Sequence, residues 1–264
     1  MRQIRPEEFR VRKILKFWLL AVSISCATLA LPAYSADSDD GDCTGAERTG
    51  AVCKCHLLDL HPTQMSVGMI EVHAKKKKFE EMSGDDLKSF KKENPEPAVI
   101  GAKGQLFITD HHHLALALLK AGEKKTSCKI LANLSRYQDH AFWDYMNHQH
   151  YVYLKDENGQ TTRHGRPLTY DDLPKTVEDL QDDPYRSLAG EVRKEGGYRK
   201  STEYFAEFQW ADFFRGQTGD NAISKGDIEN HWGKTLKRAV ELAVSPSARG
   251  LPGYSGKKEA PSRD

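Results

Sequence analysis

Four cysteines downstream of residue 36 constrain the fold of this chain more than any other feature of its sequence. They are Cys43, Cys53, Cys55 and Cys128. An even number of cysteines in an exported chain favours disulfides over free thiols. Cys53 and Cys55 lie too close in sequence to bond each other without strain, so two of the three possible connectivities remain. Both join one member of this pair to Cys128 and the other to Cys43.

A metal site is the alternative interpretation of the same region. Its ligands would be Cys53, Cys55, His56 and His61. Their spacing matches no strong zinc pattern, so the sequence favours the two disulfides.

The inference of export rests on the first 36 residues. The start is basic, with Arg2, Arg5, Arg10, Arg12, Lys13 and Lys16. An apolar run over 17–31 follows, and Ala33 and Ser35 supply the small residues that a signal peptidase needs. The run is shorter than the roughly 20 residues that span a bilayer. We therefore expect a cleaved signal peptide, a mature chain that starts at Ala36 or Asp37, a periplasmic or secreted location, and no stable membrane anchor.

The remaining residues suffice for one domain with a sizeable core. The whole chain of 264 residues carries 39 basic and 38 acidic residues, so its overall charge gives no sign of nucleic-acid binding. The expected organisation is a signal peptide (1–36), a cysteine-containing arm (37–56), an α+β domain (57–167), a helical extension packed on it (168–244) and a disordered tail (245–264).

Hydrophobic patterning predicts that the chain contains both strands and helices. Strands are expected over 57–60, 67–72, 127–134 and 151–154, and a hairpin over 97–108 with its turn at 103–104. Helices are expected over 75–94, after Asp139, from Pro184 to Gly196, over 203–215 and from Ser224 to Val244.

Three consecutive histidines follow the hairpin, and they lie where a helix is predicted to begin. We expect Asp110 to cap a helix over 111–121 that Gly122 ends. The first-turn amides of a helix have no intrahelical acceptors, and the helix dipole favours an anion there. Successive helical residues point about 100° apart, so at most two rings can face one ligand. The helix N-terminus also lowers the pKa of an imidazole, so neutral rings are expected.

Two other interpretations of the histidines remain open. One is structural, with one ring buried and hydrogen-bonded and two rings exposed to solvent. The other is a histidine metal site, although three adjacent rings do not by themselves make one.

Several segments of the chain resemble the ParB-like nucleases, a branch of the ParB/sulfiredoxin superfamily. They are LLDLHPTQ (57–64), VGMIEVH (67–73), DHHH (110–113), DDPYRSLAG (182–190) and FAEFQWADFF (205–214). The resemblance covers about 57–215. It implies a small mixed sheet with flanking helices and a nucleotide or phosphate bound where a strand meets the histidine-bearing helix.

The resemblance also assigns roles to residues. Related kinases of free serine carry Asp-Gly-His-His-Arg at the helix start, so Asp110, His112 and His113 match their aspartate and two histidines. Glu71 matches their general base, and Trp143 falls where a site tryptophan is expected.

Two positions depart from the kinase pattern. His111 stands where those kinases have glycine, which makes it the least important ring of the three. Leu114 stands where they have arginine, and the loss of that guanidinium removes a phosphate clamp. Lys75, within a run of four lysines, can supply positive charge in its place.

The resulting expectation is an exported enzyme acting on phosphate esters, with phosphodiester hydrolysis as its chemistry. In this account His112 and His113 hold the phosphoryl group, Glu71 is the general base and Asp110 orients the turn. A non-catalytic nucleotide- or phosphate-binding module and an ATP- or ADP-dependent small-molecule kinase are the alternatives. A nucleotide or a divalent metal is a possible cofactor. The expected partner is a phosphate-containing small molecule or a nucleic acid, and no protein partner can be inferred.

Overall fold

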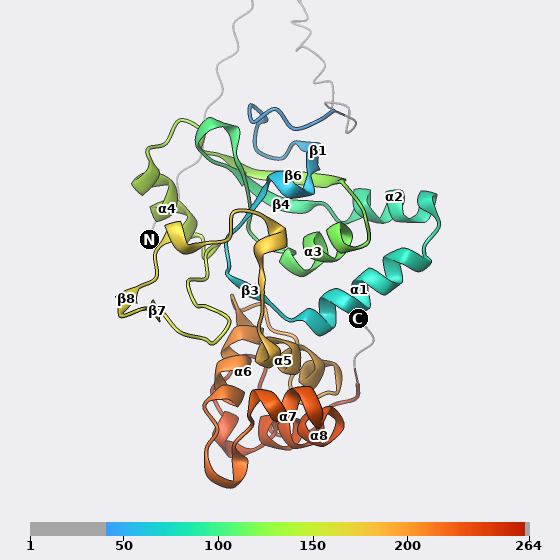
Figure 1. Cartoon of the computed structure of the whole chain (residues 1–264), viewed down its shortest axis with the longest axis vertical. Coiled ribbons are helices and arrows are strands. Elements are labelled where there is room, and N and C mark those ends of the chain that lie inside the picture. The colour runs from blue at the N-terminus through green and yellow to red at the C-terminus, as the bar shows by residue number, and fades with distance from the viewer. Residues whose placement is uncertain (1–40, 262–264) are drawn as a thin grey trace, which may run out of the picture. The chain divides into compact units, whose positions relative to one another are not determined.

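A five-stranded mixed sheet organises the first half of the chain. The structure is a computed structural model that describes residues 41–261. The strand order is β1-β6-β4-β5-β2, and Figure 1 shows β1, β6 and β4 side by side. The strands are β1 (Val52–His56), β2 (Leu60–Pro62), β4 (Glu96–Ile100), β5 (Leu106–Ile108) and β6 (Lys125–Asn133). β1 with β6 and β4 with β5 are antiparallel, whereas β4 with β6 and β2 with β5 are parallel.

Eight α-helices complete the described part of the fold, and the expected α+β class is confirmed. They are α1 (Met69–Glu81), α2 (Gly84–Glu93), α3 (His112–Lys120), α4 (Asp139–His148), α5 (Pro184–Lys194), α6 (Ala206–Arg215), α7 (Lys225–Asn230) and α8 (Trp232–Ala243). Two small ladders join β3 (Ser66–Val67) to β9 (Gln181–Asp182) and β7 (Thr162–Arg163) to β8 (Arg166–Pro167). We call 41–167 the sheet half and 168–261 the helical half.

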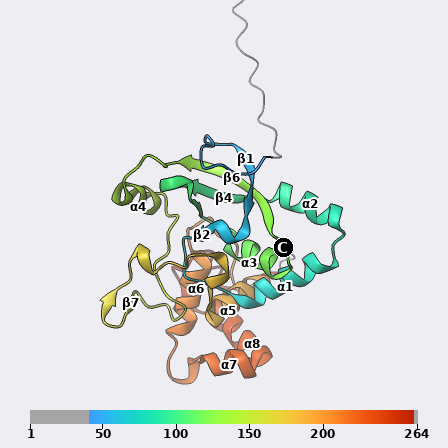
Figure 2. The same ribbon diagram turned by 45° about the horizontal axis from the view of Figure 1, so that its top comes forward.

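Helices cover both faces of the sheet, because successive side chains of its strands point to opposite faces and are apolar on both. Ala98 and Ile100 pack with the apolar residues of α3, such as Leu116. Val99, between them, packs with α4 on the other face. The helices α5 to α8 gather around a separate apolar cluster that contains Trp210 (Figure 2).

The disulfides follow one of the two connectivities that the sequence left open. Cys55 is bonded to Cys128, which joins β1 to β6, and Cys43 is bonded to Cys53, which holds the N-terminal arm against β1. Because all four cysteines are paired, the alternative metal site is wrong. The two disulfides therefore join the arm, β1 and β6, and their cysteines pack in the same apolar core as α3.

The hairpin, β6, α3 and α4 lie where they are predicted. The start of α1 differs from the prediction. Residues 67–72 were expected to be a strand, yet α1 begins at Met69. The expected single helix over 75–94 is two helices, because α1 ends at Glu81 and Ser83 starts α2 by accepting a hydrogen bond from the Asp86 amide.

Further corrections concern the second half of the chain. The segment 151–154 is not a strand and forms only one bridge, between Tyr153 and Gln64. The last expected helix is interrupted at His231 and becomes α7 and α8. The tail expected to be disordered is ordered as far as residue 261, because Trp210 Nε1 donates to the Pro252 carbonyl at 2.8 Å.

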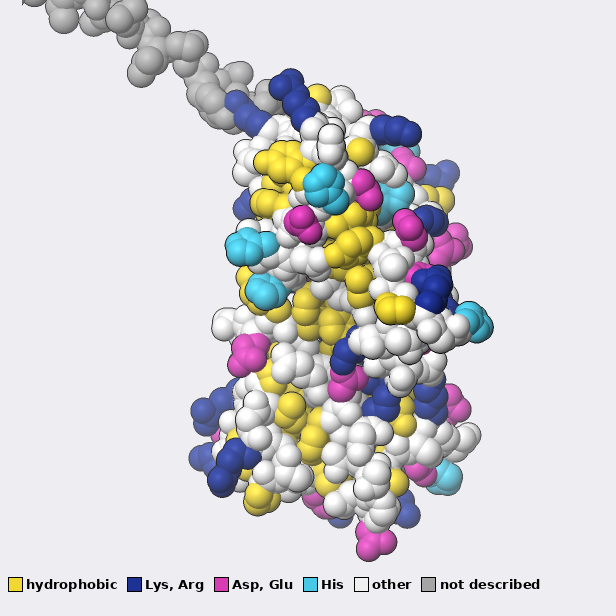
Figure 3. All heavy atoms as spheres, turned by 90° about the vertical axis from the view of Figure 1, so that its left-hand side faces the viewer, with side chains coloured by type: hydrophobic (Ala, Val, Ile, Leu, Met, Phe, Trp, Pro, Cys, Tyr) yellow, Lys and Arg dark blue, Asp and Glu magenta, His cyan; other side chains and the backbone are white. Residues whose placement is uncertain are grey.

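The surface over α4 and the β7–β8 hairpin mixes basic and acidic side chains around a broken band of apolar ones (Figure 3). It carries no basic stripe of the kind that tracks a nucleic-acid backbone. Among residues 41–261, no helix is both long and apolar enough to cross a membrane. The expected signal peptide lies outside the described residues.

Candidate functional site

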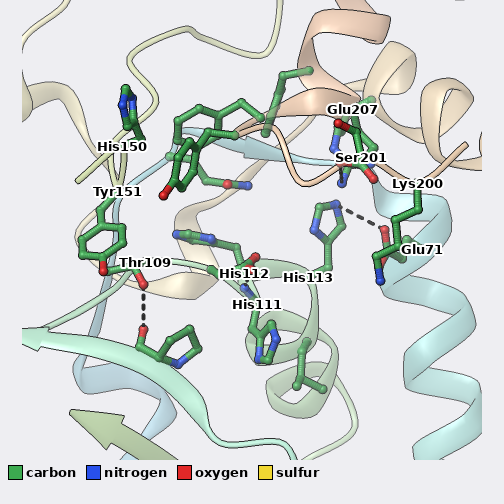
Figure 4. Close-up of a pocket in the computed structure, with 18 of the residues that line it drawn as sticks. Glu71, Thr109, His111, His112, His113, His150, Tyr151, Lys200, Ser201 and Glu207 are labelled. Atoms are coloured by element: carbon green, nitrogen blue, oxygen red, sulfur yellow. Dashed lines mark hydrogen bonds and ion pairs between the residues drawn. The ribbon is translucent and has the colours of Figure 1, made fainter. Parts of the chain in front are cut away.

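A cavity of about 670 Å³ lies where the N-terminus of α3 meets α1, α5 and the loop before α6 (Figure 4). Both halves of the chain line it. Its charged lining residues are Glu71, Lys75, Asp110, Arg186, Arg193, Lys200, Glu203 and Glu207. All three histidines also line it. The cavity thus carries equal numbers of acidic and basic side chains, and their arrangement decides what it can bind.

His112 has a structural partner. Its Nε2 accepts a hydrogen bond from the Thr63 amide at 3.1 Å, and the ring is buried. The Thr63 hydroxyl donates to the Ile108 carbonyl at 2.8 Å. His112 therefore ties the end of β2 to the start of α3.

His113 helps to cap α1. Its Nε2 accepts from the Gly68 amide at 2.9 Å. The next two amides of α1, those of Met69 and Ile70, donate to Asp182 Oδ1 at 3.1 Å and to Ser187 Oγ at 3.2 Å. These acceptors satisfy the first donors of the helix, and all of them are remote in sequence. This explains why residues 67–72 do not form the expected strand.

Both rings are neutral. Burial, together with the neighbouring charges, lowers the pKa of His112 and of His113 to about 3. Because each Nε2 accepts a hydrogen bond, each ring carries its proton on Nδ1. The expectation of neutral imidazoles is met, but neither Nε2 is available to a ligand.

Glu71 lies beside His113, with 3.8 Å between Oε2 and Nε2 (Figure 4). Burial alone raises the pKa of Glu71, but His113, Arg186 and Lys75 outweigh it and lower the pKa to about 2. Lys75 Nζ is 3.4 Å from Glu71 Oε1. A carboxylate with this pKa is a weak base at neutral pH. The geometry brings Glu71, Lys75 and His113 together and makes Glu71 a charge partner rather than a strong proton acceptor.

His111 differs from the other two histidines. It is the N-cap of α3, in place of the expected Asp110, and its φ is 62°. The Asp110 carboxylate instead accepts from the His111 amide at 2.7 Å. A left-handed backbone at a non-glycine residue costs about 1–2 kcal/mol, which accounts for the glycine at this position in the related kinases.

The His111 ring faces β4. Its Nδ1 is buried, has no hydrogen-bond partner within 41–261, and lies 3.8 Å from Glu96 Oε2. Glu96 is fully buried, and neither of its carboxyl oxygens has a hydrogen-bond partner in the described residues. Burial, together with the charge of Asp110, raises the pKa of Glu96 well above its ordinary value.

Left-handed backbone is concentrated at this cavity. Among residues 41–261, five non-glycine residues have positive φ, and three of them, His111, His150 and Phe205, line the cavity. Strained residues persist where the surrounding structure imposes them, often at functional sites. His150 stacks on Tyr204 with ring centroids 4.7 Å apart, so the strained segments also build an aromatic rim.

The helical half supplies a cation that the sequence interpretation missed. Arg186 lies on α5, is nearly buried, and its Nε has no hydrogen-bond partner within 41–261. Asp183 fixes the start of α5 by accepting from the Arg186 amide and pairing with Arg215 at 2.6 Å. Arg186 and Arg193 both lie within 4.0 Å of Glu207. The spacing of the two arginines, two helical turns apart in a helix with a clear apolar face, was the available signal.

One predicted site residue lies elsewhere. Trp143 packs against Tyr170, with ring centroids 4.4 Å apart, on the α4 side of the sheet and does not line the cavity. Leu114 is largely buried in the core but also lines the cavity, and Arg186 of α5 places a guanidinium in the same cavity. Among the described residues, no group of three or more His, Cys, Asp or Glu side chains is placed to hold a metal ion.

These features define a class: α+β proteins with a polar cavity at the N-terminus of a helix that follows a strand of a small mixed sheet. The family described as "Putative ParB-like nuclease" matches residues 53–216, and the chain belongs to this family. The crystal structure of protein Atu1540 from Agrobacterium tumefaciens is similar, with 35% sequence identity and a TM-score of 0.68. The match covers 78% of this chain and 99% of that one. No curated protein matches the chain.

Proposed function

We propose that this protein is an exported enzyme that acts on phosphate esters, with phosphodiester hydrolysis as its reaction. The observation that carries the proposal is Arg186, a nearly buried guanidinium that lines the cavity and keeps an unpartnered Nε. An arginine fork recognises phosphate through two parallel charge-assisted hydrogen bonds. Two disulfides in the described residues support an oxidising compartment outside the cytoplasm.

The other anion-binding groups lie around the same cavity. The amides of His112, His113 and Leu114 donate no hydrogen bond within 41–261, as expected for a first helical turn. Lys200 lines the cavity and forms no ion pair within the same residues. The phosphoryl oxygens then bind to Arg186, Lys200 and these amides, while the neutral histidines hold the surrounding backbone in place.

The aromatic rim favours an ester that carries a flat ring. Tyr204 is 57% exposed and stacks on His150 at the mouth of the cavity. Base stacking on aromatic side chains contributes about 1–3 kcal/mol per base. A nucleotide or the end of a single strand therefore fits both the cations and the rim.

A binding module without turnover is the second candidate. It is favoured by the low pKa of Glu71 and by the two histidines whose Nε2 atoms already accept backbone hydrogen bonds. Titration with ATP and ADP, added to the phosphate and nucleotides used below, tests the kinase alternative.

The test compares variants of Arg186 on the mature chain. Calorimetric titration with inorganic phosphate and nucleotides should show roughly 10- to 100-fold weaker binding in Arg186→Gln. Hydrolysis of bis(p-nitrophenyl) phosphate is measured alongside to detect turnover. Arg186→Lys should give an intermediate loss because the charge remains without the fork. Arg166→Gln, an exposed arginine paired with Asp172, is the control. Lys200→Gln, at an exposed residue of the cavity, gives a second measurement of phosphate and nucleotide affinity. Equal affinities in all variants would refute the anion site, and binding without hydrolysis would favour the second candidate.

A further inference from the structure

We propose that His111 and Glu96 form a proton-transfer pair that acts as the general acid of this site. The inference rests on the proposed phosphate-ester chemistry, which requires a group that protonates the leaving oxygen. Of the three histidines, only His111 keeps its Nε2 free of backbone hydrogen bonds within the described residues.

Two buried polar groups that lack partners face each other here. Glu96 is completely buried at the start of β4, and both of its oxygens are unsatisfied. His111 Nδ1 is also buried and unsatisfied, 3.8 Å from Glu96 Oε2. Leaving such groups unpaired destabilises the folded protein. A ring movement of about 1 Å would join them, and catalytic hydrogen bonds are often long before a ligand binds.

The His111 ring lines the cavity on the β4 side. Its side chain is 41% exposed, whereas its Nδ1 is buried near Glu96. Its φ of 62° turns the ring toward β4, whereas His112 and His113 point to β2 and α1. The strained backbone is therefore what separates this ring from the two structural ones.

The pair holds one transferable proton. Burial disfavours the charged carboxylate, so before an anion binds that proton lies on Glu96. A phosphate anion near Nε2 favours the form with a cationic His111 and an ionised Glu96. As the bond from phosphorus to the leaving oxygen breaks, Nε2–H donates to that oxygen. The oxygen of a water forms the new bond to phosphorus, and a proton of this water returns to the pair.

Other charges act on the pair from three directions. Asp110 precedes α3 and raises the pKa of Glu96, Lys75 on α1 lowers it, and His112 lies beside His111 on α3. These groups lie around the pair, so each is kept unchanged in the variants below.

The direct test is a side-chain NMR titration of His111 in the mature wild-type protein and in Glu96→Gln, with and without inorganic phosphate. With phosphate bound, when Glu96 is ionised, the His111 midpoint should be about one pH unit lower in Glu96→Gln than in wild type, a tenfold change in proton affinity. Identical midpoints in the two phosphate-bound proteins overturn the pairing, whether or not the protein hydrolyses anything. If Glu96→Gln does not fold, the titration of the Glu96 carboxyl is followed by ¹³C NMR instead. Comparing wild type with His111→Gly then tests the same pair through Glu96.

Catalysis provides the second readout. His111→Gly removes the ring and suits the backbone at φ 62°, so the protein should remain folded with an unchanged or higher Tm. Hydrolysis of a dinucleotide, which has a poor leaving group, should slow by about 100-fold or more. Hydrolysis of bis(p-nitrophenyl) phosphate, whose leaving group needs no acid, should slow much less. Equal slowing of both substrates would overturn the general-acid role. His164→Gly, a histidine with φ 51° at the β7–β8 turn, is the matched control.

Discussion

The sheet half and the helical half contribute to one cavity in different ways. The sheet half brings three histidines and Glu71, and two of these histidines are neutral and bonded to the backbone. The helical half brings Arg186 and Arg193, which remain charged. The first half is cross-linked by two disulfides, whereas the described part of the second has none. The conspicuous histidine motif therefore builds the frame of the site, and less conspicuous arginines supply its charge.

The largest expected effect concerns the disulfides of the sheet half. Cys55–Cys128 spans a sequence separation of 73 and Cys43–Cys53 spans 10. In the chain-entropy treatment their loss lowers the free energy of unfolding by about 4 and about 3 kcal/mol. Serine pairs at each bond, measured by guanidinium unfolding, check these values.

Hydrogen exchange on the same variants sharpens the comparison between halves. Amides of β1 and β6 should lose protection, while those of α5 and α8 should keep most of theirs. A parallel loss in both halves would mean that the described residues unfold as one cooperative unit.

The next effect is acid sensitivity, also in the sheet half. The pKa of each of His112 and His113 is about 3, below the ordinary 6.5. A group whose pKa is lowered by folding contributes stability that is complete above its unfolded pKa and is lost as the pH falls toward the folded one. Lowering the pH from 7 to 5 should therefore lower the free energy of unfolding by about 2 kcal/mol for each ring.

Unfolding at the two pH values measures this loss, and the double variant His112→Gln/His113→Gln is the comparison. Glutamine Oε1 can accept the same backbone hydrogen bonds but does not titrate. The variant should therefore lose much less stability at pH 5. An unchanged pH dependence would show that other groups cause the acid sensitivity.

A smaller effect is expected at Gly68, where the two halves meet. A Cβ at this position would lie 2.8 Å from the Ser187 amide nitrogen. The backbone there has a φ of −84° and accepts any residue, so Gly68→Ala tests the close contact alone. We expect a loss of about 2 kcal/mol and weaker phosphate binding, because α1 and α5 must separate. Gly84→Ala is the control, since nothing lies within 4 Å of its Cβ position.

Local sequence patterns predicted much of the sheet half. The β4–β5 hairpin, β6, α3 and α4 each depend on residues close in sequence, and cysteine arithmetic left two disulfide pairings, of which one is present. The start of α1 could not be predicted in this way, because Asp182, His113 and Ser187 cap it from distant segments. Val67, Ile70 and Val72 instead suggested a strand through their β-branched side chains.

The candidate site was predictable only in part for the same reason. The Asp-His-His-His segment and Glu71 lie at the cavity as the family resemblance implied. Trp143 does not, since aromatic packing with Phe107, Phe142 and Tyr170 holds it on the α4 side of the sheet. Glu96 gave no signal, because a single glutamate at the start of a strand has the pattern of an exposed residue.

The smallest effect lies in the helical half, where packing replaces covalent bonds. Tyr198 is buried, stacks on Trp210 with ring centroids 4.1 Å apart, and donates from its hydroxyl to the Ala189 carbonyl at 2.8 Å. Tyr198→Phe keeps the stack and removes one hydrogen bond, so it should cost about 1 kcal/mol. Tyr137→Phe, at a half-exposed ring, should change the stability by less than about 0.5 kcal/mol.

The size of this loss separates two accounts of the helical half. If many weak contacts share its stability, Tyr198→Phe leaves phosphate affinity unchanged, because α5 stays fixed by Asp183 and by its apolar face. If the hydroxyl of Tyr198 instead fixes α5 near Ala189, then Arg186, less than one turn earlier, shifts as well. Phosphate affinity would then fall together with stability. Calorimetric titration of Tyr198→Phe alongside its unfolding curve distinguishes the two, and we expect the unfolding curve alone to move.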